Sequence, residues 1–137
     1  MIIKTENDFL KEILYDDHAM CMLWNERENM IEVLWAGSVC NQEYNQYCDK
    51  VIEHCLLKEN SKLVMDMRKM KTDIIKSKIQ IEWLPVFIAK TKIRRQAFVS
   101  TELTEVLSQL ELINSMFQGI FEVAVFNCHL KALQWIS

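Results

Sequence analysis

The sequence predicts an α/β fold, with a mixed, largely parallel sheet of four to six strands covered by helices. Two observations support this prediction. In the second half of the chain, short apolar runs alternate with segments whose apolar residues recur every three or four positions, as in amphipathic helices. The stretch 62–68, Lys-Leu-Val-Met-Asp-Met-Arg, begins apolar and ends in an acid and a base. That pattern is typical of a buried strand emerging at the edge of a helix-covered sheet, and strand–helix alternation favours parallel pairing.

Three strands are expected before the first helix. They cover residues 12–16, 20–24 and 30–36. In the third strand, Ile31, Val33 and Trp35 share one face, because side chains alternate along a strand. A polar five-residue link joins the second strand to the third, so these two should form an antiparallel hairpin. Gly37 is expected to end the third strand.

The clearest helix of the sequence follows, with Asn41 as its expected N-cap. Its apolar positions recur with helical spacing. They are Tyr44, Tyr47, Cys48, Val51, Ile52, Cys55 and Leu56. The chain has five cysteines, an odd number, and none of them forms a Cys-x-x-Cys pair. We therefore interpret the cysteines as unpaired core thiols, with Cys48 and Cys55 on the buried stripe of this helix.

The second half of the chain alternates strands and helices. The expected strands cover residues 62–66, 95–100 and 121–126. The expected helices cover residues 79–90, 100–117 and 127–136. Pro85 lies inside the first of these helices and should kink it or begin a new helix there. Gly119 suits the left-handed conformation that ends the next helix. The full predicted order is β-β-β-α-β-α-β-α-β-α.

Length and composition indicate a single domain over residues 1–137. Half of the 137 residues are apolar and about a quarter are charged, and two glycines and one proline leave no flexible linker. Residues 1–6 lack the basic start and apolar core of a signal peptide. No apolar run approaches the ~18 residues of a membrane span. We therefore expect a cytoplasmic protein with no integral membrane segment.

The sequence carries no recognisable catalytic or cofactor motif. It has no Ser/His/Asp or Cys/His arrangement, no Gly-rich phosphate loop and no four-ligand zinc spacing, so no cofactor and no metal are expected. Asp66 and Arg68 are two positions apart and should share one face of a strand. We interpret them as an ion pair, or as a carboxylate that accepts N–H bonds from the following loop. The alternative is an anchor for the polar group of a ligand.

Basic residues gather between positions 68 and 95, where nine bases face two acids in a chain of net charge −3. Because the helix in between should run back along the sheet, we expect two smaller basic spots, over 68–78 and 90–95, at opposite ends of the sheet. Neither spot has the interleaved aromatic residues of a nucleic-acid surface, so no nucleic-acid partner is expected.

The segment 83–88 is apolar on more than one side of its expected helix, and such a helix needs a second apolar surface besides the sheet. Trp83 and Phe87 are four apart and share a face, with Ile81, Leu84 and Ile88 on an adjoining stripe. We hypothesise that this stripe packs inward. Trp83 and Phe87 would then face a second subunit or a small apolar, lipid-like ligand.

Several short motifs occur in a particular order along the chain. They are Trp35-x-Gly37, Glu43-Tyr44, Asp66-x-Arg68, Trp83 with Pro85, Ala97-x-Val99 and Ala132-x-x-Trp135-Ile136. From about Tyr15 to its end the chain resembles the SpoIIAA-like group of small uncharacterised proteins, whose fold is that of the STAS domain. The resemblance implies a sheet of four or five strands with helices and a non-enzymatic role. It also implies self-association, as a homodimer, or binding of a regulatory protein partner.

The sporulation antagonists of that fold carry a phosphorylatable serine in an Asp-Ser-Ser-Gly-like turn before a helix. The equivalent stretch here is Thr-Asp-Ile-Ile-Lys-Ser-Lys over 72–78, in which Lys76 replaces the preceding acid. We therefore expect Ser77 to cap backbone N–H groups instead of acting as a phosphorylated switch. A regulatory or interaction module is the preferred function, followed by a binder of an apolar ligand and then by an enzyme.

Overall fold

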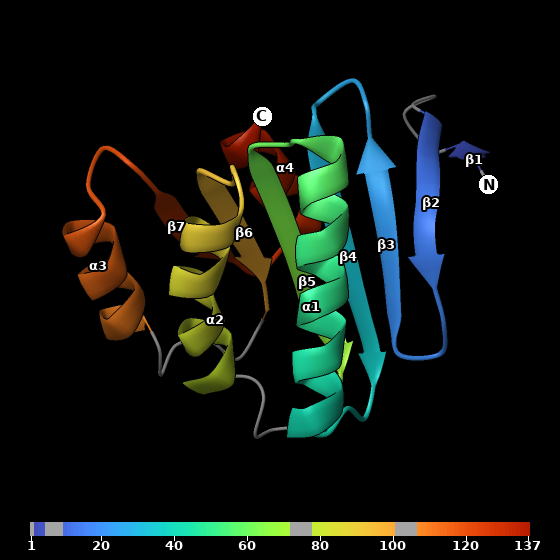
Figure 1. Cartoon of the computed structure of the whole chain (residues 1–137), viewed down its shortest axis with the longest axis horizontal. Coiled ribbons are helices and arrows are strands. Elements are labelled where there is room, and N and C mark those ends of the chain that lie inside the picture. Colours follow the sequence, from blue (N-terminus) through green and yellow to red (C-terminus); the bar gives the residue numbers. More distant parts are fainter. Residues whose placement is uncertain (1, 5–9, 72–77, 101–106) are drawn as a thin grey trace.

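The computed structural model describes residues 2–4, 10–71, 78–100 and 107–137. Its strands are β1 (Ile2–Lys4), β2 (Leu10–Asp16), β3 (Met20–Asn25), β4 (Met30–Gly37), β5 (Lys62–Met70), β6 (Arg95–Val99) and β7 (Glu122–Phe126). Its helices are α1 (Asn41–Lys58), α2 (Lys78–Lys90), α3 (Leu107–Met116) and α4 (His129–Ile136) (Figure 1).

The described strands form a single sheet in which β1 to β7 follow one another in sequence order. The pairs from β1 to β4 are antiparallel, and the pairs from β4 to β7 are parallel. The predicted mixed α/β fold is therefore confirmed. The sheet has seven strands where four to six were expected, because β1 adds a three-residue strand to the outer edge of β2.

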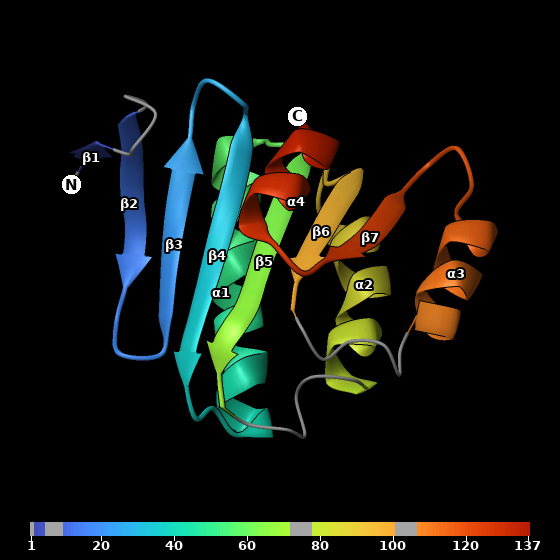
Figure 2. The ribbon, with the colours of Figure 1, turned by 180° about the vertical axis from the view of Figure 1, so that it is seen from behind.

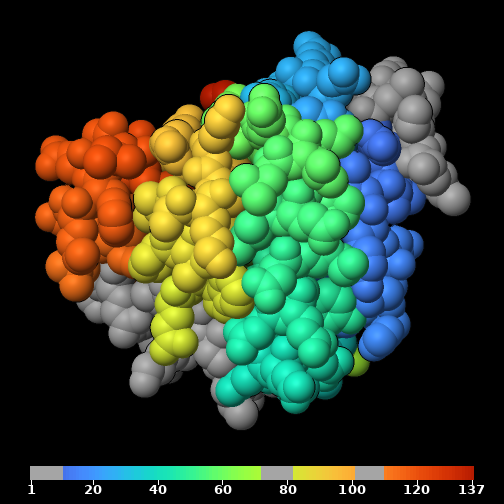
Figure 3. Space-filling model, viewed as in Figure 1, coloured from blue at the N-terminus to red at the C-terminus, as the bar shows by residue number. Residues whose placement is uncertain are grey.

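The helices divide unequally between the two faces of the sheet. Each crossover from β4 to β7 moves one strand along in the same direction, and the right-handed rule then places α1, α2 and α3 on one face. In the space-filling view these three helices lie side by side over that face (Figure 3). The last helix, α4, lies on the opposite face and contacts β5, β6 and β7 (Figure 2). No described helix lies over β2 and β3 on this second face.

Two cores result from this arrangement. The larger core lies between the sheet and helices α1 to α3, and it contains Trp35, Phe87 and Phe98. A smaller core lies under α4. Its buried members are Met30, Val64, Ala97, Val99, Ala132 and Ile136. Because side chains alternate along β5, Val64 and Asp66 point toward the α4 face of the sheet.

Several local predictions can be compared with these elements. Cys48 and Cys55 are buried on α1, as predicted, whereas Cys40 is exposed. Cys40, instead of Asn41, is the N-cap of α1: its backbone is extended, and its N–H donates to the Glu43 side chain at 3.2 Å.

Pro85 and Gly119 mark positions where the sequence predicts a special backbone conformation. Pro85 lies inside α2, which continues through it, so no new helix begins there. Gly119 has a φ of +83° in the turn after α3, the left-handed conformation that was expected. None of the described helices is long and apolar enough to cross a membrane.

Candidate functional site

Asp66 is at the centre of a polar cluster on the α4 face of the sheet. Its residue exposure is only 6%. Its Oδ1 accepts the backbone N–H of Arg68 at 3.1 Å and Nε–H of Arg68 at 3.0 Å, and its Oδ2 accepts Nη2–H of Arg68 at 2.7 Å. A further contact of 3.1 Å joins Oδ2 to Nδ1 of His129. The ion pair and the carboxylate that accepts a backbone N–H, interpreted as alternatives in the sequence, therefore occur together.

A bulge in β5 accompanies this pairing. Leu34 of β4 pairs with Asp66, but Ala36, two positions further, pairs with Lys69, three positions further. The extra residue lies in β5, where Arg68 folds back onto Asp66. Bulges of this kind bend a strand and redirect its side chains, and they are common next to functional sites.

His129 joins two strands by bridging their carboxylates. It is the first residue of α4, and its Nε2 lies 2.9 Å from Oε1 of Glu32 on β4. Glu32 is 1% exposed, and its Oε2 lies 2.5 Å from Nζ of Lys11 on β2. The result is a row of alternating charges, which we call the ion chain: Lys11, Glu32, His129, Asp66 and Arg68.

The ion chain determines the protonation of its members. Hydrogen bonds from His129 to Asp66 and to Glu32 raise the pKa of His129 to about 9. Burial alone would raise the pKa of Asp66, but the bonds from His129 and Arg68 outweigh it and hold that pKa well below its usual range. The pKa of Glu32 is lowered in the same way, against burial, by His129 and Lys11. At neutral pH the imidazole is therefore cationic, with both ring nitrogens as donors and no lone pair free.

Sequence reasoning missed Lys11, Glu32 and His129. Glu32 did carry a signal, because it lies between Ile31 and Val33 in an otherwise apolar strand, and a buried acid needs a partner. The partner could not be read from the sequence. His129 is 97 positions away along the chain and reaches Glu32 only because α4 returns across the sheet.

A hollow of about 240 Å³ lies beside the ion chain, and we call it the ion-chain pocket. Its lining residues are Leu34, Trp35, Asp66, Arg68, Lys69 and His129. The Arg68 side chain is 42% exposed, so part of its guanidinium is open to solvent while the rest is held by Asp66. This pocket therefore combines converging charged side chains with an accessible hydrogen-bond donor.

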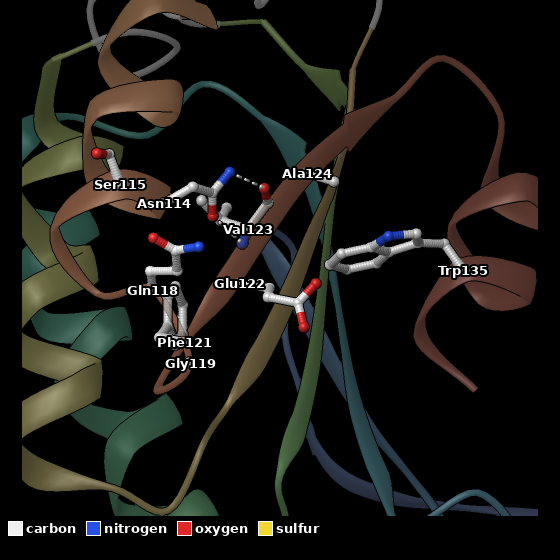
Figure 4. A pocket seen from close by; sticks show the side chains of 9 residues that line it. All are labelled: Asn114, Ser115, Gln118, Gly119, Phe121, Glu122, Val123, Ala124 and Trp135. Atoms are coloured by element: carbon white, nitrogen blue, oxygen red, sulfur yellow. Dashed lines mark hydrogen bonds between the residues drawn. The ribbon is translucent and has the colours of Figure 1, made fainter.

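A larger hollow of about 690 Å³ lies along the free edge of β7, between α3 and α4 (Figure 4). The side-chain amide of Asn114 on α3 already forms two hydrogen bonds there. Its Nδ2–H donates to the Val123 carbonyl at 2.9 Å and its Oδ1 accepts the Val123 N–H at 2.8 Å. Glu122 is the single charged residue of the lining. Because few polar groups converge here, we take the ion-chain pocket as the candidate site.

The residues proposed as a contact surface on α2 are placed differently from the hypothesis. Phe87 is 1% exposed and belongs to the larger core, so the expectation that it faces a partner is wrong. Leu84 packs inward as expected. Phe87 is three positions further, so it lies on the same face of the helix, toward the sheet. Trp83 is half-buried, and its Nε1–H donates to Oδ1 of Asn45 on α1 at 3.0 Å. Two sides of α2 are thus covered within the chain. Ser77 lies outside the described residues.

Comparison with known proteins found no matching family model and no matching curated protein. A similarity does exist among solved structures. An uncharacterised DUF3478-family protein with a SpoIIAA-like fold, from Shewanella loihica PV-4, superimposes with a TM-score of 0.54 over 92% of this chain and 100% of its own. The chain has a SpoIIAA-like fold. The sequence identity to that protein is 12%, so the similarity concerns the fold alone. The resemblance predicted from short motifs is confirmed at this level.

Proposed function

We propose that this SpoIIAA-like protein is a non-enzymatic regulatory module that binds a protein partner in the manner of STAS domains. The observation that carries the proposal is the ion chain. General acid–base catalysis needs a group that can gain or release a proton at the working pH. His129 donates from both ring nitrogens, and Asp66 and Glu32 are held ionised by their donors. These two carboxylates and this imidazole therefore hold β4, β5 and α4 together instead of exchanging protons.

The element held by the ion chain is suited to regulation. Helix α4 has eight residues, and an isolated helix of that length is not stable in water. It stays on the sheet through Ala132 and Ile136, which are buried, and through His129. A change of charge at one residue of the ion chain would change how strongly α4 is held on the sheet. Local changes of this kind alter partner binding in regulatory proteins.

A second copy of the chain is the partner that we propose for the exposed side of α3. Leu112, Met116 and Ile120 are spaced four apart and are 60%, 66% and 55% exposed. Apolar side chains that cluster on a surface favour a protein contact. Helix α3 and the turn after it lie at one end of the molecule, beyond β7 (Figure 1). Two copies could therefore meet there without disturbing either core.

Sedimentation velocity over a concentration series tests this function. We expect the wild type to form a dimer, and Met116→Glu to weaken it at least tenfold because the charge would be buried in the contact. Leu57→Glu is the matched control, because Leu57 is 72% exposed on α1, away from α3. This variant should dimerise like the wild type.

Native mass spectrometry of protein purified from its own host extends the test to other partner chains. A wild type that stays monomeric at every concentration and retains no partner chain would contradict the proposed module. So would a catalytic turnover that Glu32→Gln abolishes.

A further inference from the structure

We propose that the ion-chain pocket binds a phosphate group through Arg68 and Lys69. This site goes beyond the proposed function, which assigns no ligand to the ion-chain pocket. The phosphate could belong to a free small anion or to a phosphorylated side chain of a partner, and both present the same oxygens.

Arg68 is held in a fixed orientation for such a contact. Asp66 accepts its Nε–H at 3.0 Å and one N–H of Nη2 at 2.7 Å. A guanidinium has five N–H donors, so the Nη1 edge and one further hydrogen are left over. Among the described residues, Arg68 donates only to Asp66, from its backbone N–H, Nε and Nη2 and not from Nη1, and the side chain is 42% exposed. A planar fork that is fixed on one side and open on the other suits an oxyanion.

The charges around the pocket favour a dianion. The ion chain has three cations and two anions, so it carries one net positive charge when His129 is protonated. Lys69, which is exposed and lines the pocket, adds a second positive charge. The N-terminus of α4 at His129 contributes a partial positive charge in the same place.

Besides Glu32, already counted in the ion chain, two acids near the pocket need to be considered. The carboxylate of Asp66 lines the pocket but is already saturated by Arg68 and His129. Asp16 is on the same face, in the row Asp16, Cys21, Leu34, Asp66 across the strands. It lies two strands from Leu34, about 10 Å by ordinary strand spacing, and is exposed to solvent. At about one Debye length its repulsion is largely screened.

The pocket is large enough for a single phosphate group but too small for a whole drug-sized ligand. Its volume is about 240 Å³, below the ~300–1,000 Å³ of pockets that enclose complete small molecules. Leu34 and Trp35 add apolar or backbone surface next to the charged side chains. A phosphate with a short attached chain would therefore place its oxygens at Arg68 and Lys69 and leave the remainder outside.

The test is an NMR titration of the full chain with inorganic phosphate at pH 7 and constant ionic strength, with chloride as the reference anion. We expect saturable shifts at Nε–H of Arg68 and at the amide of Lys69. Arg68→Gln should weaken binding at least tenfold and Lys69→Gln about threefold or more. Lys90→Gln, at an exposed base on the opposite end of the sheet, should bind like the wild type.

Lys69→Gln keeps the test decisive if Arg68→Gln disturbs the ion chain, because Lys69 is exposed and lies outside that chain. A second titration with a short phosphoserine peptide separates the two sources. Binding at least tenfold tighter than inorganic phosphate indicates a partner's side chain, and equal binding indicates a free anion. Shifts that do not saturate, or an affinity unchanged in both Arg68→Gln and Lys69→Gln, would overturn the proposal.

Discussion

At the scale of single residues, the spacing of two strands explains why a histidine fits between Glu32 and Asp66. Glu32 pairs with Val64 and Leu34 pairs with Asp66, so the two acids are on adjacent strands and offset by two positions. By ordinary strand dimensions their backbone positions are about 8 Å apart. An imidazole with hydrogen bonds of 2.9 and 3.1 Å from its two nitrogens spans a similar length.

The charge of His129 makes stability depend on pH. Its pKa is about 9 in the folded chain, against ~6.5 when unfolded. Because the folded pKa is raised, the stabilisation is fully present below pH 6.5 and is lost as pH rises through 9. About a quarter of the His129 side chain is exposed. Solvent screening therefore reduces the contribution of the raised pKa to the free energy of unfolding to about 2 kcal/mol. Urea unfolding between pH 6 and 9.5 should show this loss in the wild type.

Substitution separates this contribution from that of other groups. His129→Gln should be about 2 kcal/mol less stable than the wild type at pH 6 and should lose most of the decline toward pH 9. His54→Gln is the control, because burial lowers the pKa of His54 and its contribution has the opposite slope. An unchanged decline in His129→Gln would show that other groups, such as the buried thiols, cause it.

At the scale of elements, the outer edge of β7 depends on α3. An edge strand exposes unpaired N–H and C=O groups, which can pair with another chain. Asn114 of α3 occupies both groups of Val123, as a neighbouring strand would (Figure 4). The whole of β7 reads Glu-Val-Ala-Val-Phe and has no proline or lysine to discourage pairing.

We expect Asn114→Ala to destabilise the fold by about 1–2 kcal/mol through the loss of two hydrogen bonds. It should also increase self-association along β7, since the Val123 groups become available. Chemical denaturation measures the first effect, and light scattering during prolonged incubation measures the second. Ser115→Ala, at an exposed neighbour on the same helix, is the matched control. A variant as stable and as monodisperse as the wild type would show that water replaces Asn114 without cost.

At the scale of the whole molecule, the two faces of the sheet are protected to different degrees. Three helices cover one face, and the eight residues of α4 cover part of the other (Figures 1 and 2). Proteins open in cooperative units of unequal stability. The small core under α4 and the ion chain should therefore form the unit that opens first, before the larger core under α1 to α3.

Hydrogen exchange of Glu32→Gln tests this order of opening. The substitution keeps the shape of the side chain but removes one charge between Lys11 and His129. We expect the amides of α4 to lose protection by about tenfold or more, equivalent to ~1.4 kcal/mol. The amides in the middle of α1 should change little. Equal losses in α1 and α4 would mean that the molecule opens as one unit.

Local periodicity in the sequence was enough to predict the mixed α/β fold, the burial of Cys48 and Cys55, and the contact between Asp66 and Arg68. Each depends on residues a few positions apart, because the periods of strands and helices decide which side chains share a face. The short motifs from Trp35 to Ile136 extended that prediction to the SpoIIAA-like fold, which the structural similarity supports.

Only the tertiary structure decided which surfaces meet. Periodicity placed Phe87 on a face of its helix, but the packing of α2 decided that this face is core. Periodicity could not predict the contact between Glu32 and His129, because that contact depends on α4 returning over the second face of the sheet. The sequence by itself therefore determined most of the elements and which side chains share a face within each. The ion chain and its pocket exist because helix–sheet packing brings residues far apart in the chain within hydrogen-bond distance.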